Sequence, residues 1–264
     1  MTPLVATIEG IGLIGPGLQD WPSSRELLLG LKPFTPRPTV LPLPEGLPAA
    51  ERRRMGRVVK LALAVGTQAI REAGAEAASL PTVFTSSGGD GQNCHEICRS
   101  LAQEERQLSP TRFHNSVHNA ASGYWSIATG STAPANVLCA FDASFASGLL
   151  EAVAQVSLAA MRVLLVAYDA EYPPPLHEKR PISDAFGVAF VLAPDETGAH
   201  RGARIRIGLS EAPADRLSEP QLEQLRLSIP AARSLPLLVQ LARREPGRVG
   251  VEYLDGRSLA TEVL

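Results

Sequence analysis

Asp142 lies where the sequence predicts that a strand turns directly into a helix. The apolar segment from Asn136 to Phe141 precedes it, and a run of small and apolar residues begins at Ser144. A carboxylate at such a turn can accept hydrogen bonds from the free backbone N–H groups of the helix. The residues alone therefore leave two roles open for Asp142, a helix cap and a chemical group.

Cys139 is a second candidate nucleophile, three residues before Asp142. If residues 136–142 are extended, Cys139 shares a face with Val137 and Phe141, opposite the face that carries Asp142. Free cysteines commonly pack as small apolar side chains. We therefore expect Cys139 to be a buried, unreactive thiol.

Two cysteines and two histidines resemble the halves of a zinc site. Cys94 and Cys98 have the same spacing as His114 and His118. Structural zinc usually holds together small domains that lack a core of their own, whereas this chain has apolar residues enough to fold without a metal. We expect packing and polar capping here, and no metal.

The glycines Gly10, Gly12 and Gly15 have the spacing of a dinucleotide-binding turn. That site also needs a helix directly after the turn and an acidic residue about 20 positions further on. Prolines interrupt the helix, and residues 27–44 contain no Asp or Glu. These glycines indicate close packing of a strand, and we expect no cofactor.

The composition is that of a globular protein with one large or two small domains. The 264 residues are 45% hydrophobic and 20% charged, with a formal net charge of -2, which gives no electrostatic support for binding nucleic acid. Glu151 and Arg162 interrupt the most apolar stretch, residues 143–168, so we expect no membrane span. Three cysteines and no basic leader at the start of the sequence favour a reducing, cytoplasmic location.

The elements that must position these residues alternate between strands and helices, which predicts an α/β core around a mainly parallel sheet. We expect strands near residues 4–14, 82–85, 136–142, 162–169 and 188–192. We expect helices near residues 24–29, 52–73, 92–105, 117–129 and 144–161. Ser23 and Glu26 have the spacing of a capping box, and Gly74 is suited to end the long helix.

Five segments, in order, resemble the amino-terminal half of the β-ketoacyl synthases, over about residues 4–192. They are ATIEGIGLIGPG, RMGRVVKLALAVGTQAIREAG, NAASGYWSIATG, ANVLCAFDASFASGLLEA and RVLLVAYDAE. The resemblance implies a thiolase-like fold, with a layered α/β/α domain at 1–192 and a reduced portion at 193–264 packed on the same core.

The same resemblance implies that the nucleophile is missing. Active members carry a cysteine nine residues before a Glu-Ala pair, and counting back from Glu151 and Ala152 places Asp142 there. A carboxylate cannot form the thioester that condensation requires. The family also uses two histidines from its carboxy-terminal half, whereas only His200 lies beyond residue 192, so we expect a non-catalytic subunit.

Catalytically inactive relatives, called chain length factors, pair with an active ketosynthase in polyketide-type pathways, and the short length resembles that of aryl-polyene or xanthomonadin-type factors. The resemblance implies two partners, the ketosynthase and an acyl carrier protein with its acyl chain. It places the end of the acyl tunnel at Asp90, Asn93 and Ile97. We expect the partner interface at residues 117–129 and 136–142, with Phe113, Tyr124 and Trp125 as aromatic anchors.

Two other functions stay open at this point. One is an active acyltransferase or hydrolase that uses Cys139 or Asp142, which would need a catalytic histidine. The other is a stand-alone acyl- or carrier-protein-binding module, which would form no stable heterodimer.

Overall fold

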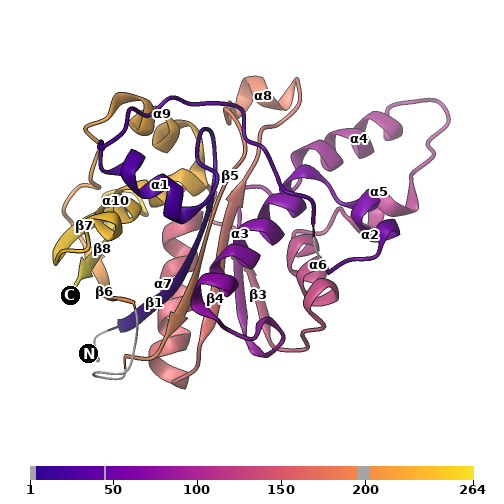
Figure 1. Cartoon of the computed structure of the whole chain (residues 1–264). Helices are drawn as coiled ribbons and strands as arrows, with labels where there is room; N and C mark the ends of the chain where they lie inside the picture. The colour runs from indigo at the N-terminus through magenta and orange to yellow at the C-terminus, as the bar shows by residue number, and fades with distance from the viewer. Residues whose placement is uncertain (1–3, 45, 196–201) are drawn as a thin grey trace.

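The computed structural model describes residues 4–44, 46–195 and 202–264. Within them, eight strands form one sheet in the order β3-β2-β4-β5-β1-β6-β8-β7 (Figure 1). The strands are β1 (Leu4–Ile14), β2 (Thr82–Thr85), β3 (Ala135–Leu138), β4 (Val163–Asp169), β5 (Phe186–Ala193), β6 (Ala203–Ser210), β7 (Gly247–Glu252) and β8 (Ser258–Val263). The helices are α1 (Trp21–Leu28), α2 (Ala49–Arg54), α3 (Arg57–Ala73), α4 (Gly91–Leu101), α5 (Pro110–His114), α6 (Ala120–Thr129), α7 (Ser144–Ala159), α8 (Leu176–Lys179), α9 (Pro220–Ser228) and α10 (Leu235–Arg243), with 3₁₀ turns η2 (Phe141–Ala143) and η3 (Pro230–Ser234).

The expectation of a mainly parallel sheet is wrong. Only β2 makes parallel pairs, with β3 and β4, and the other neighbours in the described sheet are antiparallel. A parallel pair needs a crossover, and α7 supplies one between β3 and β4. The later strands instead return beside a neighbour without a crossover helix, as β7 and β8 do across a short loop.

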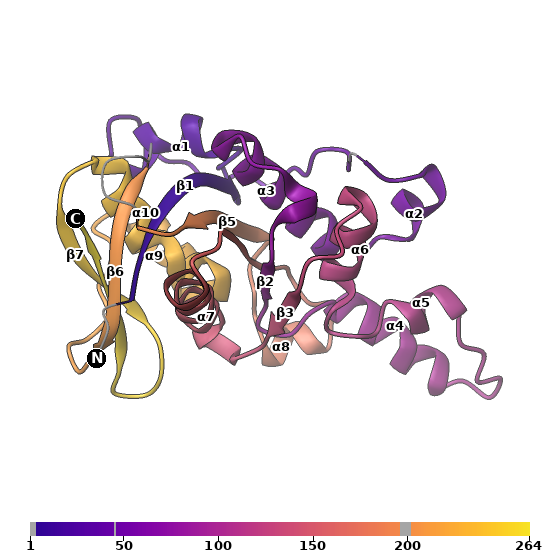
Figure 2. The same ribbon diagram turned by 90° about the horizontal axis from the view of Figure 1, so that it is seen from below.

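Helices cover both faces of the sheet, which confirms the expected layered α/β/α architecture. α3 and α6 pack on one face through residues such as Leu61, Val65 and Trp125. α7, η3 and α10 pack on the other, where Phe145 and Leu149 are buried. Figure 2 shows α3 and α7 on opposite sides of the strands, and α4 and α5 projecting beyond β3 in both views.

Gly10 and Gly12 bring β1 against the backbone of α3. A Cβ atom on Gly10 would overlap the carbonyl oxygen of Ala69, and one on Gly12 would overlap that of Val65. Any side chain would push the helix off the strand. The packing role predicted for these glycines is confirmed.

Two helix starts differ from expectation. Asp20, not Ser23, caps α1, because its Oδ1 accepts the Ser23 N–H at 2.8 Å. The long helix predicted from residue 52 is divided at Met55, which is extended, and Gly56, whose missing side chain leaves room for the Asp90 carboxylate. Its end at Gly74 is confirmed, since Gly74 adopts φ 62°.

Residues 203–263 add β6, β8 and β7 to the same sheet, and η3 packs against α7 while α9 and α10 contact η3. The sequence analysis missed β8, a short strand whose buried positions include Leu259 and Thr261. Residues 196–201, which include His200, lie outside the described residues. The division of the chain at residue 192 stays a prediction.

Candidate functional site

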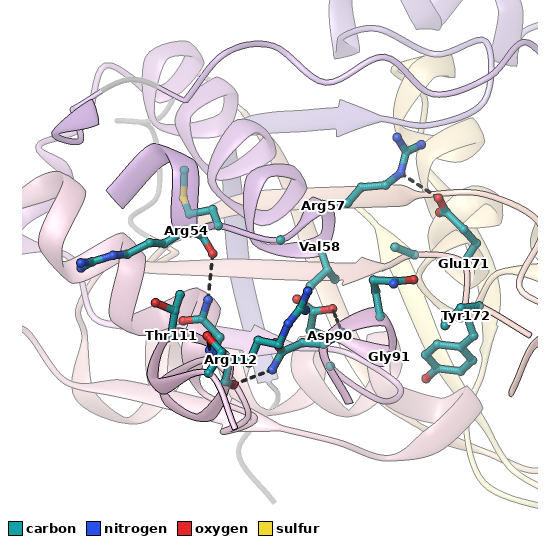
Figure 3. A pocket seen from close by; sticks show the side chains of 18 of the residues that line it. Arg54, Arg57, Val58, Asp90, Gly91, Thr111, Arg112, Glu171 and Tyr172 are labelled. Atoms are coloured by element: carbon teal, nitrogen blue, oxygen red, sulfur yellow. Dashed lines mark hydrogen bonds and ion pairs between the residues drawn. The ribbon is translucent and has the colours of Figure 1, made fainter. Parts of the chain in front are cut away.

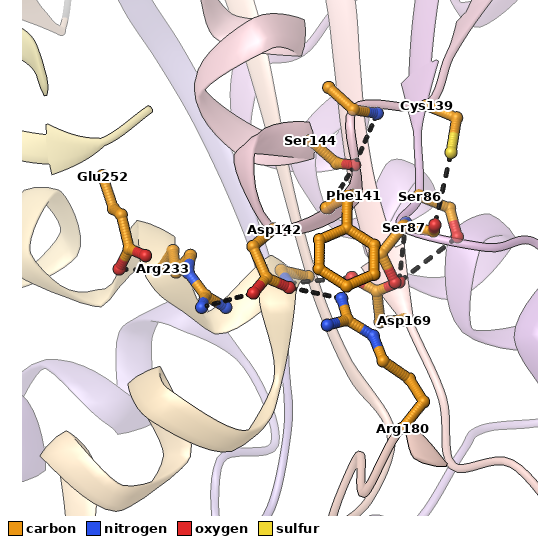
Figure 4. A network of polar contacts seen from close by, with 12 residues as sticks. Ser86, Ser87, Cys139, Phe141, Asp142, Ser144, Asp169, Arg180, Arg233 and Glu252 are labelled. Carbon is orange, nitrogen blue, oxygen red and sulfur yellow. Dashed lines mark hydrogen bonds and ion pairs between the residues drawn. The ribbon is translucent and has the colours of Figure 1, made fainter. Parts of the chain in front are cut away.

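Asp142 lies in η2, directly before α7, but it does not cap the helix. Its carboxylate is held between two guanidinium groups instead (Figure 4). Arg180 donates to Oδ1, and Arg233 donates to Oδ2 at 3.0 Å. No side-chain cap bond is made at the start of α7. The capping role considered for Asp142 is therefore wrong, because the arginines take both carboxylate oxygens.

Backbone geometry turns Asp142 toward these arginines. Phe141, just before it, has φ 51°, a left-handed conformation that costs a side-chain-bearing residue on the order of 1 kcal/mol. Its ring is 61% exposed, and the Arg180 guanidinium lies over it, 3.7 Å from the ring centroid. The turn thus presents a partly exposed carboxylate to the two arginines and an aromatic ring to the surface.

The ion pairs of Asp142 continue into the carboxy-terminal portion. Arg233, with only 8% of its side chain exposed, also lies 3.1 Å from Glu252 on β7. Glu252 is shared with Arg226, whose other partner is Glu223 on α9. Such buried charges require their partners, because removing one leaves the other uncompensated.

Cys139 is exposed, so the prediction of a buried thiol is wrong. The physical reason is that β3 ends at Leu138, and the strand alternation used for the prediction does not extend to residue 139. The thiol donates to the backbone carbonyl of Ser87 at 3.2 Å. A carbonyl oxygen cannot remove the thiol proton, so this contact does not activate Cys139.

Asp169, at the end of β4, is a buried carboxylate that the sequence analysis did not single out. Its Oδ1 accepts the N–H of Ser87 at 2.8 Å and the Ser87 hydroxyl at 2.6 Å, while Oδ2 accepts the N–H of Ala231 at 2.9 Å. Burial raises the pKa of Asp169 to about 6, although these hydrogen bonds act in the opposite direction. In the sequence, the only feature that could have pointed to Asp169 is its place at the end of an apolar strand.

A cavity of about 510 Å³ opens beside Asp142. Arg180 and Arg233 line it, as do His177 and apolar residues that include Ile182. His177 was also missed, because nothing in its surroundings in the sequence distinguishes it. Among the histidines in the described residues, His177 is the one that lines the cavity beside Asp142.

A larger cavity, of about 740 Å³, lies between α2, α4, α5 and the segment after β4 (Figure 3). Asp90 and Asn93 line it, whereas Ile97 does not. Arg57 and Arg112 add positive charge, and Figure 3 shows the Tyr172 ring beside Gly91. The lining is polar as well as apolar, unlike the wall of an acyl tunnel.

Asp90 and Asn93 are tied to neighbouring elements. Asp90 caps α4 by accepting the N–H of Asn93 at 2.9 Å, and burial raises the pKa of Asp90. The buried Asn93 side chain donates to the Arg112 carbonyl at 2.9 Å, joining α4 to α5. The Asn93 amide is therefore used in a contact between two helices, and its place at the tunnel end stays a prediction.

Two of the three predicted interface anchors are in this subunit's own core. Tyr124 is 3% exposed and Trp125 is 2% exposed, and the Trp125 ring lies against Phe84 and the Gly66 backbone. They cannot serve as surface anchors, which corrects that prediction. Phe113 is 67% exposed, and its role stays a prediction.

Within the part of the chain that the structure describes, β3 forms one edge of the sheet and pairs with a single strand, β2. Pro134 and Leu138 accept hydrogen bonds from β2, through the N–H groups of Thr82 and Ser86. Because the direction of backbone groups alternates along a strand, those of Ala135 and Val137 point outward. This edge is open to another strand.

Cys94, Cys98, His114 and His118 have the spacing of a zinc site in the sequence. In residues 4–44, 46–195 and 202–264, no three His, Cys, Asp or Glu side chains are grouped to hold a metal. Cys94 and Cys98 are both exposed on α4. Over the same ranges, no helix is long and apolar enough to cross a bilayer.

A family model for the β-ketoacyl synthase N-terminal domain matches residues 30–243, most of the chain. The chain belongs to the β-ketoacyl synthase family. The Asp142 turn and α7 of this member fall within the matched residues. Among curated proteins, no sequence matches it.

Solved structures confirm the fold of this synthase relative. One is the ketosynthase ApeO in complex with its chain length factor ApeC from Xenorhabdus doucetiae, with a TM-score of 0.74 at 24% identity over 98% of this chain and 99% of the other. The ishigamide ketosynthase/chain length factor has a TM-score of 0.72 at 13% identity, with 98% and 99% covered. A β-ketoacyl synthase from Burkholderia phymatum STM815 has a TM-score of 0.60 at 14% identity, with 90% and 70% covered.

Proposed function

We propose that this chain is a non-catalytic, chain-length-factor-type subunit that pairs with an active β-ketoacyl synthase in the synthesis of a polyene, polyketide or fatty-acid-like product. Family membership supports a role in this chemistry. The match to chains from complexes of a ketosynthase with a chain length factor, over nearly the whole of both chains, supports the partner role.

The observation that carries the proposal is the state of Asp142. It stands where the resemblance places the nucleophile, and both of its carboxylate oxygens are engaged by arginines. A carboxylate is a poor nucleophile compared with a thiolate, and ion pairing lowers its electron-donating ability further. A transferable acyl thioester cannot form on this residue.

The exposed Cys139 supports a second candidate function, that of an acyltransferase. Against it, the thiol contacts a carbonyl and no base, although His177 lies in the cavity beside the nearby Asp142. Mass spectrometry of the purified chain after incubation with acyl-carrier protein separates the two functions. An acyl adduct that is lost in Cys139→Ser would support the acyltransferase and contradict our proposal.

The open edge of β3 supports a specific mode of partner binding, in which a strand of the ketosynthase extends the sheet. Phe141 follows this edge and is exposed, and Phe113 belongs to α5, which projects beyond it. Exposed aromatic rings beside a strand edge are suitable interface anchors. Phe141 therefore joins Phe113 as a proposed anchor in place of the buried Tyr124 and Trp125.

We keep Ile97 as the proposed determinant of tunnel length. It lies on α4, which projects from the body of the subunit toward the side where β3 is open (Figure 2). Asp90 and Asn93 are proposed to support α4 in this position rather than to contact the acyl chain. The acyl chain would arrive on a carrier protein bound to the assembled pair.

Co-purification tests the proposal directly. The tagged chain, expressed in its native cell, should retain a ketosynthase in equal amount through size-exclusion chromatography. The isolated chain should show neither condensation nor decarboxylation of malonyl-carrier protein. A chain that remains alone at micromolar concentration, or that decarboxylates by itself, would contradict the assignment.

A further inference from the structure

Two arginines from distant segments of the chain contact the Asp142 carboxylate. Arg180 and Arg233 come from segments 38 and 91 residues away in sequence, and each donates to a different oxygen of the same carboxylate. Figure 4 shows the two guanidinium groups converging on Asp142; Arg180 directly follows α8, and Arg233 lies in η3. Paired arginine donors of this kind are well suited to a planar anion.

Each arginine has a second contact that does not involve Asp142. The Arg180 guanidinium lies over the Phe141 ring, and Arg233 lies 3.1 Å from Glu252. Glu252 also lies 2.9 Å from Arg226, which has Glu223 as a second carboxylate partner. Without Asp142, Arg233 would keep Glu252, whereas the Arg180 guanidinium, 21% exposed, would lose the carboxylate that it contacts.

We infer that Arg180 and Arg233 form a carboxylate-binding site that this chain fills with its own Asp142 side chain. Asp142 is then a positioning residue, which ties η2 to the α8 segment and to η3. The chemical class of ligand that fits the site is a small monocarboxylate such as formate or acetate. The inference does not depend on the proposed partner role, because it concerns only contacts within the chain.

The cavity beside Asp142 gives such a ligand access to the site. It has a volume of about 510 Å³ and is lined by both arginines. Truncation of Asp142 to alanine would extend this cavity by the volume of a carboxylate group. Formate or acetate could then occupy the vacated space and restore the link between the two guanidinium groups.

Chemical rescue of Asp142→Ala tests this inference. Loss of the bridging carboxylate should lower the Tm of the purified chain by roughly 4 to 8 °C. Sodium formate or acetate in the millimolar range should restore a large part of this loss in a saturable way. Sodium chloride at equal ionic strength should not, and the wild-type chain should respond equally to all three salts.

Two variants define the site and serve as controls. Arg233→Met in the Asp142→Ala background should abolish the rescue, because one of the two donors is lost. Asp195→Ala removes a different carboxylate, which pairs with Arg204. Its Tm should not respond to formate. Equal effects of formate and chloride on Asp142→Ala would overturn the inference.

If Asp142→Ala does not yield folded protein, Asp142→Asn combined with Arg180→Gln provides the test. The double variant should lose little more Tm than either single variant, since both changes break the same link. Additive losses would mean that Asp142 and Arg180 act independently, which would also overturn the inference.

Discussion

At the scale of single residues, the chemistry of this protein is decided by charged side chains that are engaged with each other. Asp142, which the family resemblance places at the nucleophile position, is held by Arg180 and Arg233. Asp169 accepts hydrogen bonds from the backbone N–H and the hydroxyl of Ser87 and from the backbone N–H of Ala231. Both carboxylates are thus engaged in contacts within the chain.

Asp169 should make stability depend on pH in an unusual direction for a carboxylate. Its pKa in the folded chain, about 6, lies above the ordinary 3.8, so the folded state binds the proton more tightly than the unfolded state. This contribution is complete below about pH 4, and it is lost as the pH rises toward 6. The loss is on the order of 3 kcal/mol. Urea unfolding at pH 4.5, 5.5 and 6.5 measures it.

The matched variant is Asp169→Asn, which cannot titrate. It should be less stable overall, because the amide NH₂ faces a backbone N–H donor, yet it should lack the part of the pH dependence between 4 and 6. Asp195→Asn should keep that dependence. An identical slope in Asp169→Asn and wild type would show that another group carries it.

At the scale of elements, close contacts between backbones set the position of α3 on β1. Gly12→Ala would drive a Cβ into the Val65 carbonyl, and we expect a loss of about 3 kcal/mol or more in the free energy of unfolding. Gly123→Ala is the control, because a Cβ there meets nothing within 4 Å and α6 should gain about 0.5 to 1 kcal/mol. Chemical denaturation compares the two. Equal effects would contradict the packing role of Gly12.

β3 provides a second prediction at this scale. Val137→Pro removes a backbone N–H that points away from β2, so the subunit should stay folded while pairing with a ketosynthase strand is lost. Val137→Thr keeps the N–H and should still bind. Co-purification and circular dichroism measure binding and folding separately. Retained binding by a folded Val137→Pro variant would place the interface elsewhere.

Most elements could be predicted from the sequence, because apolar periodicity, Gly74 and the alternation of strand and helix are local signals. The antiparallel pairs were not predictable in this way, since they depend on where β5, β6 and β8 return in space. The site was predictable only at Asp142. Arg180, Arg233 and His177 approach it from distant segments, and the burial of Tyr124 and Trp125 depends on α3 and Phe84 rather than on their own neighbours.

At the scale of the whole molecule, α4 and α5 project from the sheet on the side of the open strand edge (Figures 1 and 2). We expect Ile97→Trp to shorten the acyl products of the assembled pair, because a bulkier residue at a tunnel end imposes overlap that dense packing cannot absorb. Mass spectrometry of carrier-bound intermediates measures product length. Asn93→Trp should instead weaken the chain itself, since it breaks the contact with the Arg112 carbonyl. An unchanged length distribution with Ile97→Trp would show that α4 only packs.

We propose above all that this subunit shapes the acyl tunnel and that the partner ketosynthase carries out the condensation. The most direct measurement is chain elongation by the ketosynthase that co-purifies with it, with and without this subunit, and with the ketosynthase cysteine replaced by alanine. We predict product of defined length only when both chains are present and the cysteine is intact. Product that persists after the cysteine is replaced would show that this chain catalyses. An unchanged product without this subunit would show that the partner does not need it, and either result would contradict the account.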